Sequence, residues 1–340
     1  NEIVLEDETQ NSNLSTKQIH SKVKRKGNSI SFFNLASERI KKKYLKGTFS
    51  VVRAELSILH NIQEYVNHRP SEPILEAREK IKKRRKERIS KGRKYEHHTI
   101  DLIKKFSKDN SLSFEDITTQ FLDGFKTFCI SHLEQKKTRT VTNQLILIRT
   151  LYNQAIKESI IHEKNYPFAG EKEKIRIQSG NKIGLNIQEI KAIENLQLES
   201  KSSTWHTKNV YLFSYYFAGV RISDVLELKW NNFMEDRIFY EMNKNEKHVS
   251  IKISQKAQAI LDLYIKDKNS ENDYVFPFLK KANQNSKEDI FKKTRNATSL
   301  FNNHLKKIAI LCSIKKPLSN HISRHSFGNI SKNKINPEVL

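Results

Sequence analysis

Residues 217–230 read FAGVRISDVLELKW and lie between an apolar helix and the one convincing strand pattern of the chain. The apolar residues 210–217 predict a helix that ends at Gly219. Downstream, residues 237–242 and 249–253 alternate apolar and polar side chains, and the polar segment between them completes the pattern of a β-hairpin. Helical periodicity then returns, so the fold class that we predict is mainly α with a small antiparallel sheet.

The composition of the chain supports this fold class and indicates a polyanionic partner. Among 340 residues, 62 lysines and arginines stand against 38 acidic residues, which gives a net charge of +24. Nine glycines and six prolines are too few for a turn-rich all-β chain. The two cysteines, Cys129 and Cys312, cannot form a disulfide framework or a four-cysteine zinc site. No run of 18 apolar residues occurs, so we expect no membrane insertion. The basic excess is spread through the whole chain and favours a nucleic-acid partner. The low cysteine count fits a reducing, cytoplasmic setting.

The chain divides into four parts by composition. Residues 1–28 begin acidic and end in a basic run, which predicts an arm or a small appended element. Residues 29–169 carry successive segments of helical periodicity and predict a helical domain, with one helix start at Ser113–Asp116. The polar, lysine-rich stretch 170–184 has no periodicity and is the predicted linker. Residues 185–340 form the second predicted domain.

The most basic segment of the helical domain is residues 78–94, which contain eleven basic and two acidic side chains. A solvated charged helix explains many such runs. At this density we favour contact with the nucleic-acid backbone, because lysine and arginine neutralise phosphates and release counterions. The side chains of this domain that we expect to bind DNA are Lys82, Lys83, Arg84, Arg85, Lys86, Arg88, Lys137 and Arg139.

Four residues of the second domain are candidates for a phosphodiester site: Arg221, Lys244, His321 and Arg324. Each alone also has a structural explanation, such as a surface arginine, a turn lysine or a capping histidine. Together they suit phosphoryl transfer, because two guanidinium groups match the charge of a pentacoordinate phosphorane and a lysine can protonate a leaving oxygen. This set contains neither a nucleophile nor the carboxylate cluster that would hold magnesium.

A metal-based alternative rests on His321 and His325, since two histidines four residues apart on a helix can bind zinc. The metalloprotease pattern requires glutamate directly after the first histidine, and Ile322 occupies that position. We therefore predict no metal and no cofactor.

Two strings of the second domain resemble the arginine boxes of the tyrosine recombinase (phage integrase) family, as in integrases of bacterial mobile elements. Residues 217–230 resemble the first box, and residues 320–327, NHISRHSF, resemble the H-x-x-R box, with the predicted hairpin between them. Residues 137–168 are similar to the last helix of the family's core-binding domain, so the resemblance covers most of the chain from Ser31 on. The basic run looks like an insertion near residues 70–98.

The resemblance implies a role for each site residue. Arg221 and Arg324 would bind the scissile phosphate, Lys244 would be the general acid, and His321 would assist proton transfer. Three residues are second candidates or supports: Lys247 for the lysine, Asp224 as the acidic position that orients the first arginine, and His325 as a residue packed beside the site.

The resemblance also implies an architecture and an activity. A helical core-binding domain and a catalytic domain would close as a C-shaped clamp on DNA. The reaction would be site-specific recombination through a 3′-phosphotyrosyl intermediate, without metal or ATP, and it would integrate or excise a mobile element at the nucleoid of a bacterial cytoplasm. The partners would be double-stranded DNA attachment sites, the other copies in a homo-tetramer, and an accessory DNA-bending protein.

The nucleophile of the family is a tyrosine that follows the second arginine, yet no tyrosine occurs after Tyr274. We therefore expect that residues 185–340 lack the tyrosine segment, that the nucleophile lies beyond Leu340, and that these 340 residues alone bind DNA without cutting it. Two alternatives stay open. One is a catalytically incomplete, sequence-specific DNA-binding protein derived from a recombinase, and the other is a type IB topoisomerase-like enzyme.

Overall fold

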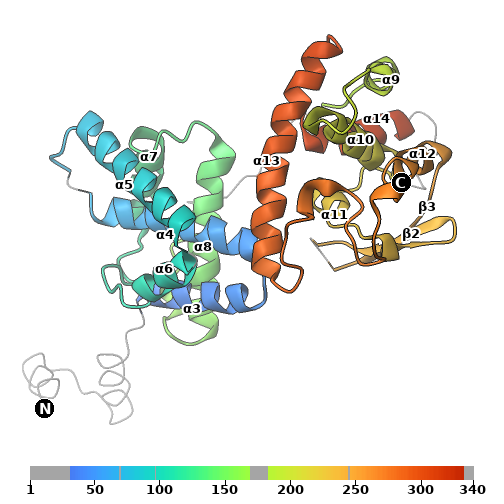
Figure 1. Ribbon diagram of the computed structural model, residues 1–340. Coiled ribbons are helices and arrows are strands. Elements are labelled where there is room, and N and C mark those ends of the chain that lie inside the picture. The colour runs from blue at the N-terminus through green and yellow to red at the C-terminus, as the bar shows by residue number, and fades with distance from the viewer. Residues whose placement is uncertain (1–30, 69, 96, 169–182, 244–245, 333–340) are drawn as a thin grey trace, which may run out of the picture. The chain divides into compact units, whose positions relative to one another are not determined.

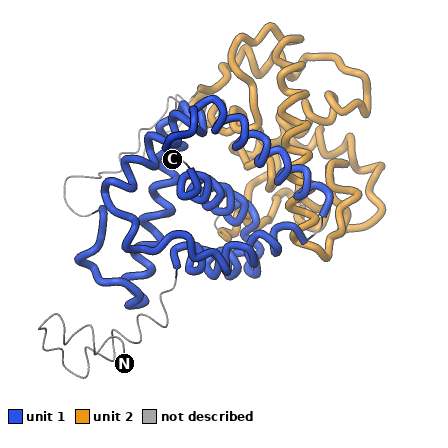
Figure 2. Tube along the Cα trace, turned by 90° about the vertical axis from the view of Figure 1, so that its left-hand side faces the viewer, with its two compact units in different colours: residues 1–179 blue, residues 180–340 orange. Residues whose placement is uncertain are grey.

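The computed structural model describes residues 31–68, 70–95, 97–168, 183–243 and 246–332 of the chain. The expected arm and most of the predicted linker lie outside the described residues. The chain forms two compact units, residues 1–179 and 180–340 (Figure 2). Each unit has a hydrophobic core of its own.

Helices are the regular elements of the described part of unit 1, residues 1–179 (Figure 1). They are α3 (Phe32–Leu45), α4 (Phe49–Val66), α5 (Ile74–Lys94), α6 (His98–Phe106), α7 (Thr119–Ser131) and α8 (Thr138–Lys157), followed by the 3-10 turn η1 (Glu163–Asn165). Ser31 caps α3, because its hydroxyl accepts a hydrogen bond from the Asn34 amide at 3.1 Å. The core is rich in aromatic rings, and Phe33 stacks on Phe106 with 5.5 Å between ring centroids.

One helix of unit 1 begins later than the sequence predicts. Ser113 and Asp116 exchange hydrogen bonds: the Asp116 carboxylate accepts from the Ser113 amide at 2.9 Å, and the Ser113 hydroxyl accepts from the Asp116 amide at 3.2 Å. These bonds close a single turn. Helix α7 starts only at Thr119, where the Thr118 hydroxyl accepts from the Phe121 amide. The capping pattern at Ser113 therefore marks a turn and not a helix start.

Unit 2, residues 180–340, combines helices with one small sheet (Figure 1). Its helices are α9 (Ile187–Asn195), α10 (Ser203–Tyr216), α11 (Ile222–Leu226), α12 (Gln255–Asp262), α13 (Lys287–Leu311) and α14 (Asn320–Lys332), with 3-10 turns η2 (Trp230–Asn232), η3 (Ile265–Asp267) and η4 (Pro277–Leu279). The core of the unit includes α10, which packs against α12, α13 and α14. The predicted apolar helix is the second half of α10.

The sheet is antiparallel, in the order β1 (Phe233–Met234), β2 (Arg237–Glu241) and β3 (His248–Lys252). Phe239 pairs with Ser250, and Tyr240 pairs with Val249, so β2 and β3 form the predicted hairpin. The two-residue strand β1 was not predicted, because two residues are too few to show a period. The expected fold class, mainly α with a small antiparallel sheet, is confirmed.

Neither a membrane helix nor a disulfide occurs in the part of the chain that the structure describes. No helix there is long and apolar enough to span a bilayer. Cys129 is buried and Cys312 is half-buried, and both thiols are free. Burial raises the pKa of the Cys129 thiol to about 12, so this thiol stays protonated and acts as a packing residue.

Candidate functional site

A left-handed turn between α10 and α11 sets the position of Arg221. Ala218 and Gly219 both have positive φ values, 55° and 72°. The Gly219 amide donates to the Ser214 carbonyl at 2.9 Å, and the Ser214 hydroxyl donates to the Val220 carbonyl at 2.6 Å. Both bonds fix the turn to Ser214 of α10. Arg221 then begins α11 as its N-cap residue.

Helix α14 carries the second arginine and contacts this turn. A Cβ atom on Gly219 would lie 2.9 Å from the Cβ atom of Arg324, so only glycine allows this approach. The Ser323 and Ser214 hydroxyls are hydrogen-bonded at 2.9 Å, and the Ser326 hydroxyl accepts from the Leu185 amide at 2.8 Å. These buried bonds fix the rotation of α14 about its axis.

Arg221 and Arg324 come together in the structure, and uncharged groups hold both. Nη1 of Arg324 donates to the Gly219 carbonyl at 3.3 Å, and Nη1 of Arg221 donates to the Met242 sulfur at 3.3 Å. Neither arginine forms an ion pair with a carboxylate of the described residues. No carboxylate among the described residues therefore takes up their N–H donors, and these donors can meet an anionic ligand.

The charges of both arginines influence the pKa of Tyr240 on β2. Burial raises the pKa of its hydroxyl to about 12, the nearby carboxylate of Asp224 adds to the rise, and Arg221 and Arg324 oppose it. The hairpin, the α10–α11 turn and α14 meet at one place, because Met242, directly after β2, contacts Arg221, and Arg324 on α14 contacts Gly219 of the turn. A hydroxyl with a raised pKa is a poor nucleophile at neutral pH.

Asp224 lies in the first turn of α11, the helix that Arg221 begins. Its side chain is 3% exposed, and burial raises the pKa of its carboxyl, while the charge of Arg221 opposes the rise. The Ser223 hydroxyl donates to Oδ1 at 3.3 Å, whereas Oδ2 has no hydrogen-bond partner among the described residues. The structure thus brings the predicted supporting acid into the field of Arg221.

The end of the hairpin is tied to the residue that follows α11. The Asn243 side chain donates to one carboxylate oxygen of Glu227 at 3.1 Å, and the Thr294 hydroxyl donates to the other at 3.1 Å. Lys244, the next residue after Asn243, lies outside the described residues. Lys247 is exposed, and its carbonyl accepts from the Met242 amide at 2.9 Å. Met242 is also the residue whose sulfur contacts Arg221.

The two predicted histidines lie on α14. His321 is exposed and precedes Arg324 by three residues, so both side chains share one face of the helix. His325 is half-buried. No group of three or more histidine, cysteine or acidic residues that could hold a metal ion occurs among the described residues. The histidine pair therefore has no third ligand there.

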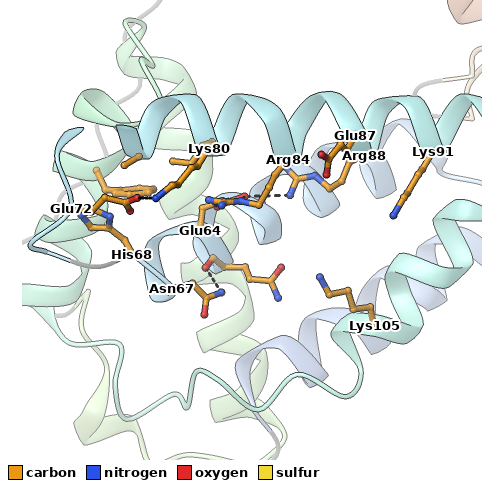
Figure 3. A pocket seen from close by; sticks show the side chains of 14 residues that line it. Glu64, Asn67, His68, Glu72, Lys80, Arg84, Glu87, Arg88, Lys91 and Lys105 are labelled. Carbon is orange, nitrogen blue, oxygen red and sulfur yellow. Dashed lines mark hydrogen bonds and ion pairs between the residues drawn. The ribbon is translucent and has the colours of Figure 1, made fainter. Parts of the chain in front are cut away.

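In unit 1, the whole basic run is part of α5, and three of its arginines contact α4. Arg84 donates to both carboxylate oxygens of Glu64, and Arg88 forms a second ion pair with this carboxylate at 3.6 Å (Figure 3). Arg85 donates to the Asn61 side chain at 2.9 Å. Three predicted DNA contacts therefore also hold the helix in place.

The lysines of α5 among the predicted DNA contacts are exposed and have no partner on α4, a helix that the structure describes in full. Lys82 pairs with Glu79 at 3.1 Å, while Lys83 and Lys86 are exposed and form no ion pair with another described residue. At the start of α8, Lys137 and Arg139 are also exposed. The predicted DNA contacts thus divide into exposed side chains and arginines that are partly engaged within the unit.

A pocket of about 680 Å³ lies beside α5 in unit 1. Figure 3 shows Lys80, Arg84, Arg88 and Lys91 reaching into it from α5, and Lys105 reaching toward it from α6. Its lining includes none of the residues predicted for phosphoryl transfer.

Sequence reasoning missed the buried polar partners of the cationic residues. Glu64 and Asn61 lie within an apolar helical pattern, three residues apart on one face of the helix. A polar pair on such a face was the available signal for buried partners of cationic side chains. Asn243 and Glu227 gave no comparable signal, because their contact depends on how the hairpin folds back.

Two family models match the chain. The phage integrase SAM-like domain matches residues 74–175, a range that includes all of α5, and the phage integrase family matches residues 185–339. Together they cover about three quarters of the chain. The interpretation of the basic run as an insertion stays a prediction.

Several solved structures are similar to the chain. DNA-bound lambda integrase shows 14% identity and a TM-score of 0.46, over 75% of this chain and 86% of that chain. The Tn1549 transposon integrase in complex with circular intermediate DNA shows 14% identity and a TM-score of 0.46, over 71% and 82%. The XerH recombinase bound to its difH substrate shows 14% identity and a TM-score of 0.46, over 69% and 68%. A search among curated proteins found no match.

Proposed function

The chain belongs to the phage integrase family of tyrosine recombinases, and we propose that it is a site-specific DNA recombinase that integrates or excises a mobile element. The observation that carries the proposal is the approach of Arg221 and Arg324 across Gly219, with both guanidinium groups held by uncharged partners. Two such groups suit a phosphate whose negative charge grows in the transition state.

In the proposed reaction, a tyrosine hydroxyl attacks the scissile phosphate, the bond to the 5′ oxygen breaks and a 3′-phosphotyrosyl bond forms. Arg221 and Arg324 stabilise the charge on the phosphate. Lys244, or Lys247 as the second candidate, gives a proton to the leaving 5′ oxygen, and His321 assists proton transfer. A 5′ hydroxyl from the partner strand then attacks the phosphotyrosyl bond, rejoins the DNA and releases the tyrosine. The whole reaction needs neither metal nor ATP.

Unit 1 supplies the grip on the DNA backbone in this proposal. Its exposed cations on α5 and at the start of α8 neutralise phosphates without reading the base sequence. Duplex attachment sites are the substrate, four copies assemble on two synapsed sites, and an accessory DNA-bending protein is a further candidate partner. The two units act together as a clamp on the duplex.

A nicked suicide substrate tests the chemistry, because a nick lets the cleaved end diffuse away and traps the covalent adduct. A polypeptide of these 340 residues should bind the duplex and form no adduct on a denaturing gel. A longer product of the gene with a tyrosine after residue 340 should form one, and peptide mapping should find that tyrosine attached to DNA.

The Tyr240→Phe variant is the matched control for the nucleophile. An adduct formed by the 340 residues and lost in Tyr240→Phe would assign the nucleophile to β2 and contradict the later tyrosine. If no form of the protein gives an adduct, strand cleavage is wrong and the second candidate function holds.

The second candidate is a sequence-specific DNA-binding protein derived from a recombinase. It is favoured by one observation: Tyr240, the tyrosine whose pKa both arginines influence, has a hydroxyl with a raised pKa and is a poor nucleophile at neutral pH. A type IB topoisomerase-like enzyme is the third candidate. Product analysis separates it from a recombinase, since a topoisomerase changes the linking number and a recombinase joins two sites.

A further inference from the structure

Apolar packing holds only the first part of α5. The buried side chains of this 21-residue helix are Ala77 and Ile81, both in its first eight residues. Beyond them, the large apolar side chain Ile89 is 57% exposed. The distal part of α5, residues 84–94, therefore needs another source of attachment to the unit.

Polar contacts with two residues of α4 attach this part of the helix to the unit, in addition to the contact of α5 with α6. The Glu64 carboxylate forms ion pairs with Arg84 and Arg88, and the Asn61 side chain accepts a hydrogen bond from Arg85. Glu64 and Asn61 are three residues apart and share one face of α4. The Asn61 side chain in turn donates to Gln144 on α8 at 3.0 Å, so the contact continues into the core of the unit.

The ion pair between Arg84 and Glu64 has one buried and one open side. The Glu64 side chain is 8% exposed, whereas the Arg84 side chain is 51% exposed. Nε and Nη2 of Arg84 face the carboxylate, and five N–H donors in a fixed planar fork leave others for a second acceptor. An arginine fixed from behind by a carboxylate is preorganised to bind a phosphate in front.

We propose that Glu64 is a positioning residue for DNA binding: it fixes residues 84–94 of α5 and orients Arg84 so that its open edge meets a duplex phosphate. This inference rests on the proposed function, because it assigns a support to the DNA grip of unit 1. Lys86, an exposed lysine within this segment, depends on the same attachment for its placement.

The sign of the expected effect separates positioning from simple electrostatics. Removal of a negative charge from a DNA-binding surface strengthens binding when charge alone matters. Loss of a positioning carboxylate weakens binding, because the helix and its cations are no longer ordered before the DNA arrives. A neutral Glu64→Gln variant keeps the size of the side chain and therefore tests the sign.

Glu55 is the matched control on the same helix. It is a buried carboxylate with two cationic partners, Lys43 at 2.6 Å and Arg39 at 3.4 Å, and both partners lie on α3. Glu55→Gln therefore removes an equivalent charge and equivalent ion pairs without touching α5.

The experiment measures amide hydrogen exchange of residues 84–94 without DNA, and affinity for a duplex over a range of salt concentrations. Both quantities are measured in Glu64→Gln, Glu55→Gln, Arg84→Gln and the Glu64→Gln, Arg84→Gln double variant. Glu64→Gln should speed exchange in residues 84–94 about tenfold and weaken binding about tenfold. Glu55→Gln should leave both values near those of the unaltered chain. Adding Arg84→Gln to Glu64→Gln should cost less affinity than Arg84→Gln alone.

Unchanged exchange or stronger binding in Glu64→Gln would overturn the inference, and so would equal effects of the two glutamine variants. If the unaltered chain bound no duplex, the proposed DNA grip would fail. The exchange data would then still decide whether Glu64 holds α5.

Discussion

The arginines of the two units are held by different kinds of partner. In unit 1, Arg84 and Arg88 share the buried carboxylate of Glu64 (Figure 3). In unit 2, Arg221 contacts a thioether sulfur and Arg324 contacts a backbone carbonyl. A carboxylate offsets much of the guanidinium charge, whereas a neutral acceptor only orients it. The difference teaches that the density of basic residues in a segment does not measure the charge left for a ligand.

The largest effect should follow loss of an arginine in unit 2. Arg221→Ala or Arg324→Ala should slow adduct formation about a thousandfold in a form of the protein that makes the adduct, because each arginine meets charge that grows in the transition state. Arg221→Lys keeps the charge but loses the fork, and should recover only part of the rate. Near-normal cleavage by Arg221→Ala would contradict the assignment.

A smaller effect should follow from closing the space between the two arginine segments. Gly219→Ala adds a Cβ against Arg324 at a φ of 72°, which should lower the free energy of unfolding by about 3 kcal/mol. Gly328→Ala on α14 is the control, since nothing lies within 4 Å of its added Cβ. Urea unfolding followed by tryptophan fluorescence reports on this unit, because both tryptophans, Trp205 and Trp230, lie in it. Equal stability of the two variants would refute the close approach.

Unit 1 should be sensitive to acid. Burial, together with the charges of Arg88 and Lys105, lowers the pKa of His60 to about 4. Below the unfolded pKa of 6.5, the unfolded chain takes up a proton that the folded chain refuses, so stability falls as pH falls from 6.5 toward 4. Between pH 7 and 5 the loss should be about 2 kcal/mol. Circular dichroism of His60→Gln should show a smaller loss, and an equal loss would exclude His60 as the cause.

The smallest effect should follow loss of exposed lysines on α5. A double Lys83→Gln and Lys86→Gln variant should reduce the slope of log affinity against log salt by about 2, since each phosphate contact contributes about 0.9. The matched variant on α3, with Lys41 and Lys42 replaced by glutamine, should change the slope less. An unchanged slope in the α5 variant would show that these lysines face solvent and do not contact DNA phosphates.

Much of this comparison was open to prediction from the sequence. The hairpin followed from period-two alternation, and the sequence patterns around Arg221 and Arg324 resembled a known family before any contact was known. The attachment of α5 was not predictable, because the partners of its arginines lie on α4, in a different segment of the chain. The start of α7 was misplaced because Ser113 and Asp116 satisfy the same local pattern in a turn.

The most direct test of the account is the rate of adduct formation as a function of protein concentration, in a form of the protein that makes the adduct. It is measured for an Arg221→Ala, Arg324→Ala double variant and for the Lys83→Gln, Lys86→Gln variant. If unit 2 performs the chemistry and unit 1 the grip, the arginine variant has a strongly reduced maximal rate at an unchanged half-saturating concentration. The lysine variant then reaches the normal maximal rate at a higher concentration. A reduced maximal rate in the lysine variant, or a normal rate in the arginine variant at high protein concentration, would contradict the assignment of chemistry to unit 2 and of DNA binding to unit 1.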